Sequence, residues 1–565
     1  MTDHFSWISH FMRSLYREGV RHIYISPGSR STPLALSAAV HPGFQKHVVL
    51  DERSAGFQAL GIGKSTGKPA VLICTSGTAV TNYFPAIAEA RQSGTPLIVL
   101  TADRPPYLRY TGSSQTIDQL KIFGSYAVMF HELGEPVHQD PDLKRLELLA
   151  RQAVTDSVHF GGAVQINAPF RKPLEPASES IEIEHNRNQE QVEELKDASK
   201  IREITSKNTL SDPLFNLINH SNRPLVIGGP ETPERVLNQT FTELLRCLQA
   251  PVLCEPGSNL PAGDFRVTGY ESFLRSPEVA DELKPDLILL FGESPFGKSL
   301  QAFLETYREV ETIQFLNRES WQDSAFSVNH RVILPSDQVT TTGLETKQKT
   351  WFQKWKKESE TVDSLKLELL NNSDELTDAH IYAHFTGFLP DNWQMMLSNS
   401  FTVRDFSMFG EAVKPGNKVF VNRGAAGIDG VLSTALGILE GSKQPMLCLM
   451  GDLAFYHDSN AMLSARDLSQ PLMIVVINNG GGNIFRMLPI YDNKEYFKTY
   501  FETPQHAEIE HLAKAHDLKY YSVDTRDKLK KIKPELVTGN RTILVECKTD
   551  PEVSMKLRKI FWSGS

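Results

Sequence analysis

Two polar motifs of this sequence stand directly after apolar, β-branched runs. The segment CLMGD ends at Asp452, and the segment VVINNGGG brings Asn479 and three glycines. Because the carboxyl ends of parallel strands meet at one edge of a sheet, we expect Asp452 and Asn479 to lie close together. They are 479 − 452 = 27 positions apart, which leaves room for one crossover helix, at about 455–469, and a return strand.

These residue types favour a hard cation. A carboxylate and a side-chain amide suit Mg²⁺ (or Mn²⁺), which keeps few protein ligands and completes its shell with phosphate oxygens. The carbonyl of Gly481 would supply a third oxygen, and the glycines would let the chain turn closely around metal and phosphates before a helix begins at Ile484. The motif therefore predicts a metal–diphosphate anchor. The alternative is a plain turn in which Asp452 and Asn479 only cap helices.

Length and composition predict a globular protein of several domains. The 565 residues exceed what one core supports. The net charge of −9 argues against nucleic acid or an anionic membrane as a partner, and no apolar run reaches the roughly 18 residues of a membrane helix. The five cysteines are scattered and form no C-x-x-C pair, which indicates reduced thiols. We therefore expect a soluble, cytoplasmic α/β protein.

Short runs of Val, Ile and Leu, each followed by a loop and a helical pattern, recur along the chain. Such near-continuous runs are typical of strands buried on both faces of a parallel sheet. They predict an α/β fold with three doubly wound parallel-sheet domains, at 1–180, 207–346 and 376–565. The expected strands lie within 22–31, 47–56, 70–79, 96–106 and 163–170, then 223–229, 250–256, 285–294 and 311–317, and finally 394–400, 418–424, 445–452, 471–479 and 541–547.

Two charged connectors separate the predicted domains. Residues 181–206 are poor in apolar side chains, and a solvated helix is the simplest interpretation. Residues 347–375 are helical in pattern and carry Trp351, Phe352 and Trp355 at i, i+1, i+4 spacing. We expect these three aromatic side chains to pack the second helix on a core instead of binding a ligand.

The GD and NN pairs resemble the cofactor motif of the thiamin-diphosphate (ThDP) decarboxylase and acetolactate-synthase superfamily. Glu52, at the end of the expected strand HVVLDE, matches the glutamate of that superfamily that binds the aminopyrimidine. The resemblance implies that its carboxyl group hydrogen-bonds N1′ and favours the imino form at N4′, which removes the C2 proton. The alternative for Glu52 is a surface carboxylate paired with Arg53 or Lys64.

Eight motifs narrow the resemblance to the 2-succinyl-5-enolpyruvyl-6-hydroxy-3-cyclohexene-1-carboxylate (SEPHCHC) synthases of menaquinone biosynthesis. The resemblance covers both outer domains closely and the middle one loosely. It implies decarboxylation of 2-oxoglutarate on ThDP and conjugate addition of the succinyl carbanion equivalent to isochorismate. The motifs are SPGSRSTPL (26–34), DERSAGF (51–57), TSGTAVTNYFPA (75–86), TADRPP (101–106), TGSSQTID (111–118), NSFTVRD (399–405), NRGAAGIDG (422–430) and NNGGGNIF (478–485).

Arginines in these motifs suit the implied substrates. Both substrates are dicarboxylates, which guanidinium forks bind in bidentate geometry. Each arginine, taken alone, has the alternative of a structural salt bridge, most readily Arg104 in TADRPP. The resemblance places substrate contacts at Ser29, Arg30, Gln115, Arg404 and Arg423, pocket lining at Ile484 and Phe485, a diphosphate contact at Ser400, and at Ile428 the bulky residue that bends ThDP into its V form.

Two positions depart from the family pattern. In the middle domain the segment FGKSL resembles one that supplies a basic residue, so Lys298 is a candidate substrate contact. Some members carry arginine next to that lysine, whereas this chain has Ser299. Asn483 stands where Gly or Gln is usual in the glycine run.

The resemblance also implies an assembly. In this superfamily the glutamate and the metal site meet across subunits, so we expect a homodimer or a homotetramer. The alternatives are another ThDP carboligase of the acetolactate type, a ThDP-fold binding subunit without catalysis, and a nucleotide-binding regulator. The last is disfavoured because GIGKSTGK (61–68) lacks the spacing of a phosphate-binding P-loop.

Overall fold

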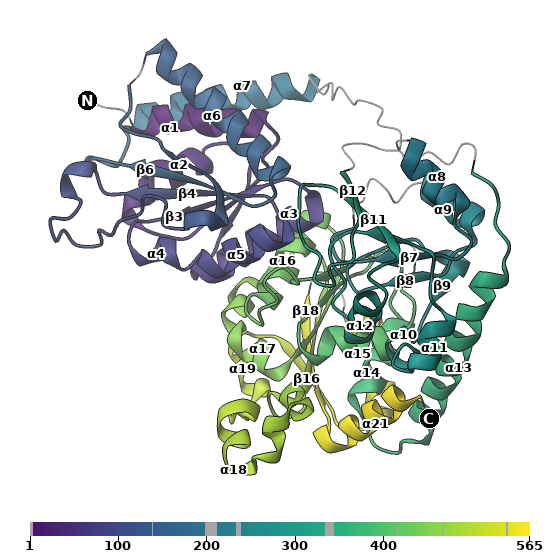
Figure 1. The fold of residues 1–565 in the computed structure, drawn as a ribbon. Helices are drawn as coiled ribbons and strands as arrows, with labels where there is room; N and C mark the ends of the chain where they lie inside the picture. Colours follow the sequence, from purple (N-terminus) through teal and green to yellow (C-terminus); the bar gives the residue numbers. More distant parts are fainter. Residues whose placement is uncertain are drawn as a thin grey trace. The chain divides into compact units, whose positions relative to one another are not determined.

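The computed structural model describes residues 4–137, 139–197, 212–232, 239–333, 344–414, 416–466, 468–537 and 541–564. Over these residues the chain forms three six-stranded sheets, and every strand pairs in parallel with its neighbours (Figure 1). Helices flank each sheet. The predicted α/β class with three doubly wound parallel sheets is confirmed.

The first sheet has the order β2-β1-β3-β4-β6-β5. Its order reverses direction between β1 and β3, which is where open α/β sheets bind ligands. The strands are β1 (His22–Ile25), β2 (Gln45–Val48), β3 (Ala70–Cys74), β4 (Leu97–Asp103), β5 (Ala127–Glu132) and β6 (Ala163–Pro169), and the helices are α1 (His4–Arg17), α2 (Thr32–Ala39), α3 (Glu52–Thr66), α4 (Thr78–Thr81), α5 (Phe84–Ser93), α6 (Asp140–His159) and α7 (Ser178–Asp197).

The second sheet has the order β12-β11-β10-β7-β8-β9. Its strands are β7 (Pro224–Gly228), β8 (Val252–Cys254), β9 (Arg266–Val267), β10 (Leu287–Phe291), β11 (Glu311–Leu316) and β12 (His330–Ile333), and its helices are α8 (Asp212–His220), α9 (Gln239–Leu248), α10 (Tyr270–Phe273), α11 (Pro277–Glu282) and α12 (Lys298–Thr306), followed by the long α13 (Thr350–Asn372). The three aromatics of α13 are buried, as predicted.

The third sheet has the order β14-β13-β15-β16-β18-β17, with its reversal between β13 and β15. Its strands are β13 (Gln394–Leu397), β14 (Val419–Val421), β15 (Met446–Gly451), β16 (Leu472–Asn478), β17 (Lys519–Val523) and β18 (Thr542–Lys548), and the helices are α14 (Asp378–Gly387), α15 (Phe401–Phe409), α16 (Val431–Ser442), α17 (Asp452–His457), α18 (Lys494–Phe497), α19 (Ile509–Ala515), α20 (Arg526–Leu529) and α21 (Pro551–Ser563).

Every predicted strand segment overlaps an observed strand, but four observed strands had not been predicted. They are β5, β9, β12 and β17, and each lies at the edge of its sheet. Edge strands face solvent on one side and need no continuous apolar run. The side chains of β5 are half-buried throughout, and β9 has only two residues.

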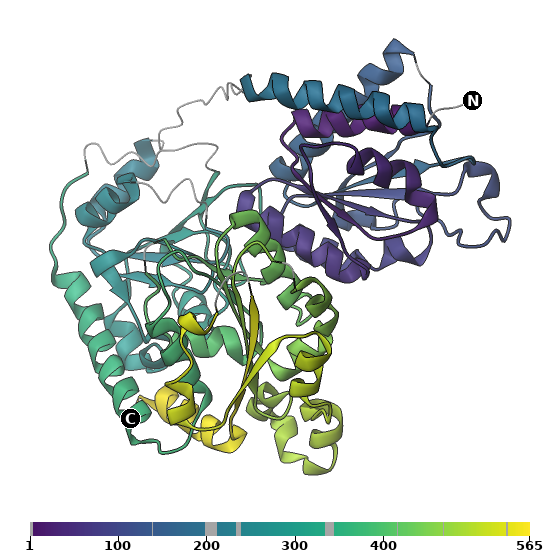
Figure 2. The same cartoon turned by 180° about the vertical axis from the view of Figure 1, so that it is seen from behind.

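The connector helix α7 is less solvated than its sequence suggests. It lies along α1 (Figures 1 and 2), where Ser6 donates a hydrogen bond to Glu184 at 2.8 Å. Glu184 and Asn188 are each 1% exposed. Polar side chains with hydrogen-bond partners can therefore bury a helix that has few apolar residues. The rest of the predicted connector, 198–206, lies outside the described residues, as does the start of the middle domain at 207–211.

The chain divides into two compact units. One contains 1–203, 422–444 and 456–470, and the other contains 204–421, 445–455 and 471–565. The first unit thus includes α16, which follows β14 in sequence. The boundaries of the three predicted domains differ from those of these two units and stay a prediction. Among the described residues, no helix is both long and apolar enough to cross a membrane.

Glycines bring α3 and α16 together within the first unit. A Cβ on Gly61 would lie 2.3 Å from the Thr434 carbonyl oxygen, and one on Gly437 would lie 1.9 Å from the Gln58 carbonyl oxygen. Backbone therefore contacts backbone at this crossing. Two functional candidates depend on it, because Glu52 begins α3 and Ile428 shortly precedes α16.

We expect Gly437→Ala to destabilise the protein by about 1–3 kcal/mol, because overpacking against a backbone carbonyl forces the helices apart. Thermal unfolding followed by circular dichroism measures the loss. The control is Gly387→Ala in α14, where the nearest atom to the new Cβ is a side-chain carbon at 3.9 Å. Equal melting temperatures for the two variants would contradict this account of the crossing.

Candidate functional site

Asp452 and Asn479 leave neighbouring strands at the same edge of the third sheet. β15 and β16 pair in parallel with Gly451 opposite Ile477, so the next residues of each strand emerge together. Asp452 is the first residue of α17, and Asn479 follows β16 directly. The crossover is α17 and a 3₁₀ segment at Ser459–Ser464, instead of the one helix expected at about 455–469. His457 ends α17.

The Asp452 carboxylate is buried against the glycine run. It is 4% exposed and accepts a hydrogen bond from the Leu453 N–H at 2.8 Å. Burial raises its pKa to about 6, while N–H groups of Leu453, Gly481 and Gly480 lower it. A buried carboxylate with a raised pKa is one that a cation would stabilise in its ionised form.

The oxygens of Asn479 and Gly481 converge on one point. The Asn483 side-chain amide, Nδ2, lies 2.9 Å from Asn479 Oδ1 and 3.3 Å from the Gly481 carbonyl oxygen. One electropositive group therefore reaches both oxygens, as a cation would. Within the described part of the chain, no cluster of three or more His, Cys, Asp or Glu could hold a metal ion. The donors present fit a hard cation that takes its other ligands from a phosphate group.

The glycine run allows the close turn that the sequence suggested, and it also leaves room for another segment of backbone. A Cβ on Gly481 would lie 2.0 Å from the Glu502 carbonyl oxygen, and one on Gly482 would lie 2.5 Å from that of Phe501. These glycines therefore admit the backbone of residues 501–502. Only Gly480, with φ of 83°, has open space around its missing side chain. The helix after the run is 3₁₀ and begins at Asn483, one residue before the predicted start at Ile484.

Three motif residues have a positive φ angle, which is unusual outside glycine. They are Gln115 (φ 57°), Ser400 (φ 70°) and Ala426 (φ 58°). Ser400 stands at the reversal between β13 and β15, and Arg404 Nη1 donates to its carbonyl oxygen at 2.6 Å. Strained backbone of this kind clusters at functional sites.

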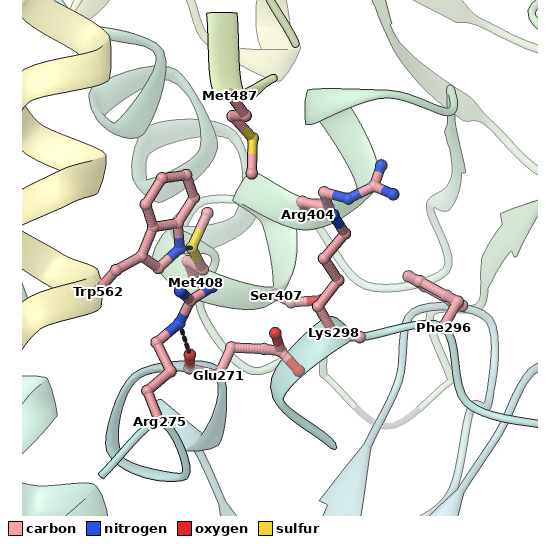
Figure 3. A pocket seen from close by; sticks show the side chains of 10 residues that line it. Glu271, Arg275, Phe296, Lys298, Arg404, Ser407, Met408, Met487 and Trp562 are labelled. Atoms are coloured by element: carbon pink, nitrogen blue, oxygen red, sulfur yellow. Dashed lines mark hydrogen bonds between the residues drawn. The ribbon is translucent and has the colours of Figure 1, made fainter. Parts of the chain in front are cut away.

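Lys298 and Arg404 line one small pocket in the second unit (Figure 3). Its cavity of about 30 Å³ has room for a water or the end of one polar group. The apolar walls are Met408, Met487 and Trp562, and Arg275 lies over the Trp562 ring at 5.0 Å. Sequence reasoning missed Arg275, because it lies outside the family motifs.

Two carboxylates, the buried Glu255 and the half-buried Glu271, hold the beginning of α12, which carries Lys298. Glu255 accepts the N–H groups of Phe296 and Gly297 at 3.2 and 3.1 Å. Glu271 accepts that of Ser299 at 3.2 Å. Burial raises the pKa of Glu255 to about 7, with the Glu271 charge adding to the effect. Glu255 directly follows β8, so its position at a strand end could have identified it from the sequence as a candidate functional residue.

Ser299 has a structural contact of its own. Its hydroxyl group donates to the Glu271 carbonyl oxygen at 2.8 Å, and it is 5% exposed. Ser299 is not among the residues that line the pocket, although its neighbours Lys298 and Glu271 are.

Arg30 and Gln115 lie near the point between β1 and β3 where the strand order of the first sheet reverses. A Cβ on Gly28, next to the exposed Ser29, would lie 2.3 Å from Thr75 Cβ, so the ends of β1 and β3 approach closely. Gln115 Nε2 donates to the Ser76 carbonyl oxygen at 3.2 Å. Arg30 is 6% exposed, and its Nη1 donates to Phe170 O at 2.7 Å.

The Arg30 guanidinium group is incompletely satisfied. Its Nε is buried and has no hydrogen-bond partner within the described ranges. Burial and the Arg104 charge lower the pKa of Arg30. An anion at this edge of the sheet would satisfy both the hydrogen-bonding group and the charge.

Glu52 is the first residue of α3, four positions past the end of β2. The prediction that Glu52 ends a strand was wrong, because the exposed edge strand β2 stops at Val48. Across the residues described, its carboxylate makes no hydrogen bond or ion pair. The alternative partners are engaged elsewhere: Arg53 Nη2 donates to the His457 carbonyl oxygen at 2.7 Å, and Lys64 lies 3.9 Å from Glu89.

Glu89 fixes the segment NRGAAGIDG within the first unit. Its carboxylate accepts the N–H groups of Gly424 and Ala425 at 3.0 and 2.6 Å. This segment carries Arg423 and the half-buried Ile428. Sequence reasoning missed Glu89, since a carboxylate inside a helical pattern gives no sign of such a distant contact.

The predicted site residues are thus divided between the units. In the second unit Ile484 is half-buried, and Phe485 is 36% exposed and packs edge-on against Phe501. The first unit contains Ser29, Arg30, Glu52, Gln115, Arg423 and Ile428, and the second contains Lys298, Ser400, Arg404, Asp452, Asn479, Gly481, Ile484 and Phe485.

Two family models match the chain. The one described as "Thiamine pyrophosphate enzyme, N-terminal TPP binding domain" matches residues 8–122. The one described as "Thiamine pyrophosphate enzyme, C-terminal TPP binding domain" matches residues 406–547. Thiamin diphosphate is the same molecule as thiamine pyrophosphate, so the predicted cofactor class is confirmed.

Curated relatives match along nearly the whole chain. A protein of Desulfitobacterium hafniense is 35% identical over 98% of this chain and 98% of its own length. One of Bacillus velezensis is 34% identical over 96% and 95%, and one of Listeria innocua is 33% identical over 100% and 98%. All three bear the name 2-succinyl-5-enolpyruvyl-6-hydroxy-3-cyclohexene-1-carboxylate synthase.

Proposed function

The chain belongs to the 2-succinyl-5-enolpyruvyl-6-hydroxy-3-cyclohexene-1-carboxylate synthase family, and on this premise we propose that it decarboxylates 2-oxoglutarate and adds the succinyl carbanion equivalent to isochorismate. The product is SEPHCHC, an intermediate of menaquinone biosynthesis. The observation that carries the proposal is the convergence of the Asn479 and Gly481 oxygens beside the buried Asp452 carboxylate. That donor set supports a metal–diphosphate anchor, and family membership supports the substrates.

The cofactor is held mainly by its diphosphate. Asp452, Asn479 and Gly481 would hold Mg²⁺ (or Mn²⁺), and Ser400 would contact the diphosphate. Ile428 would support the bound cofactor, and the Glu52 carboxyl group would hold a proton at N1′ of its aminopyrimidine. Thiamin diphosphate, when bound, supplies the carbanion chemistry that side chains lack.

The substrates are bound through their carboxylates. Arginine and lysine donate charge-assisted hydrogen bonds to carboxylate oxygens, and burial strengthens these bonds. The incompletely satisfied Arg30 and the pocket shared by Lys298 and Arg404 support this role. The full set comprises the cations Arg30, Lys298, Arg404 and Arg423, the polar contacts Ser29 and Gln115, and the apolar lining of Ile484 and Phe485.

The proposed enzyme is a cytoplasmic homodimer or homotetramer. All five cysteines are free, which supports a reducing compartment. Glu52 and the cation site belong to different units, which is compatible with sites completed between subunits. Sedimentation at working concentrations measures the assembly, and a catalytically competent monomer would overturn it.

The test of the function is an assay with purified protein, ThDP, Mg²⁺ and 2-oxoglutarate, with isochorismate present or absent. We expect isochorismate to be consumed and a succinyl adduct to form, identified by its mass. Decarboxylation without an adduct would retain the cofactor and reject the acceptor, which would favour another carboligase. The absence of both ThDP binding and reaction would reject the proposal.

We expect Lys298→Ala to raise the KM of at least one substrate about 10- to 100-fold with a smaller change in kcat, because a hydrogen bond to a charged group contributes about 1.5–3 kcal/mol. Steady-state kinetics in each substrate measures the change. The matched control is Ser299→Ala, whose side chain bonds the backbone of Glu271. An unchanged KM for both substrates in Lys298→Ala would remove this residue from the binding site.

A further inference from the structure

Three charged side chains form a buried cluster behind the candidate cation site. Asp378 begins α14, Asp405 lies in α15, and Arg558 lies in α21. They are 1%, 0% and 2% exposed. Charged side chains are rarely fully buried unless they are paired, because removing them from water is unfavourable. The burial of this cluster therefore needs a structural or functional explanation.

Arg558 joins the two carboxylates. Its Nε donates to Asp405 Oδ1 at 2.8 Å, and its Nη2 contacts Oδ2 of both Asp405 and Asp378. The Arg558 guanidinium also lies over the Phe401 ring at 3.9 Å. Two carboxylates against one guanidinium leave the cluster with one excess negative charge when both are ionised.

Asp378 is the member that reaches the cation site. Asn479 Nδ2 donates to Asp378 Oδ2 at 3.2 Å. On its other oxygen, Asp378 accepts the hydroxyl groups of Thr549 at 2.5 Å and Ser554 at 3.3 Å. Four donors therefore surround the Asp378 carboxylate. An ionised carboxylate can accept hydrogen bonds from all of them, because both of its oxygens are acceptors.

This contact decides which way the Asn479 amide faces. An amide has a donor end and an acceptor end, and the two point in opposite directions. With Nδ2 held by Asp378, the amide presents Oδ1 on its other side, where it lies 2.9 Å from Asn483 Nδ2. A flipped amide would present hydrogens to a cation and would bind none.

We propose that Asp378 is a positioning residue for the divalent cation, acting through Asn479, and that Arg558 and Asp405 hold it in place. The inference rests on the proposed function, since it requires a cation at Asn479. Partners of metal ligands commonly change metal affinity about 10- to 100-fold when removed. The competing explanation is that the cluster only joins α14, α15 and α21.

The test compares Asp378→Asn with Asp405→Asn. Both changes remove one negative charge from the cluster and one carboxylate from Arg558, but only Asp378 contacts Asn479. Binding of Mn²⁺ in the presence of ThDP is measured from the electron paramagnetic resonance signal of the free ion. Thermal unfolding of the same samples without metal measures the structural loss.

We expect Asp378→Asn to raise the Mn²⁺ dissociation constant at least about tenfold, and Asp405→Asn to raise it about threefold or less. Equal changes in the two variants would overturn the inference and leave the cluster structural. If Asp378→Asn does not fold, Thr549→Val replaces it, because this change removes one donor to Asp378 and keeps the charge. A Thr549→Val protein with wild-type Mn²⁺ affinity would then overturn the inference.

The wild-type protein separates this inference from the proposed function. Failure of the wild type to bind Mn²⁺ with ThDP would reject the metal–diphosphate anchor itself, and the inference with it. Normal binding by the wild type with equal effects in both variants would reject the role of Asp378 alone.

Discussion

Glu52→Gln should give a folded protein whose turnover falls by about a hundredfold to ten-thousandfold, the range that a positioned proton-holding group contributes. Glutamine has nearly the shape of glutamate but no carboxyl proton to hold at N1′. Because the Glu52 carboxylate makes no hydrogen bond or ion pair over the described residues, its loss should leave the melting temperature nearly unchanged. Single-turnover and steady-state kinetics, with ThDP binding measured separately, give the result.

The control for Glu52 is the preceding residue. Asp51 accepts the Arg53 N–H at 2.9 Å and the Asn460 side-chain amide at 2.9 Å, so it caps α3. Asp51→Ala should lower stability by about 0.5–2 kcal/mol, as loss of a helix cap does, with a smaller effect on turnover. If Glu52→Gln kept more than a third of the wild-type kcat, the proposed role of Glu52 would be wrong.

Asp452→Asn should abolish metal-dependent binding of ThDP at ordinary cofactor concentrations. Changes outside the ligand shell already cost about 10- to 100-fold in metal affinity, so loss of the only charged ligand should cost at least about 100-fold. The substitution also turns an NH₂ group toward backbone N–H donors that now face a carboxylate. Both effects act in the same direction.

Thermal unfolding with and without Mg²⁺ and ThDP measures this loss. Wild-type protein at about 100 times the dissociation constant should gain about 2.7 kcal/mol, and Asp452→Asn should gain almost nothing. The control is Asp458→Asn, at a fully buried carboxylate that accepts the Ser433 N–H at 2.8 Å. This control should lose stability in both conditions and keep the gain on adding cofactor. An equal gain in Asp452→Asn and wild type would remove Asp452 from the metal site.

Much of the fold could be predicted because burial leaves a local record. Central strands such as β3, β4 and β16 are apolar at nearly every position, since both faces of a parallel sheet are covered. Because β15 and β16 were predicted to be parallel, their carboxyl ends implied that Asp452 and Asn479 lie at the same edge of the sheet. Edge strands carry no such record, and in β17 only Val523 is buried, while the adjacent Tyr520 and Tyr521 are partly exposed.

By itself, the sequence determined the fold class, the family and the residue types that could bind a cation, a diphosphate and carboxylates. Only the tertiary structure decided the contacts that orient them. Glu89 holds a segment 335 positions away, and Arg558 lies 180 positions from Asp378. The packing of α16 on α3 depends likewise on Gly61 and Gly437, which are far apart in the chain. The physical reason is that periodicity and strand-end motifs record only local burial, whereas a hydrogen bond between distant residues exists only after the chain has packed.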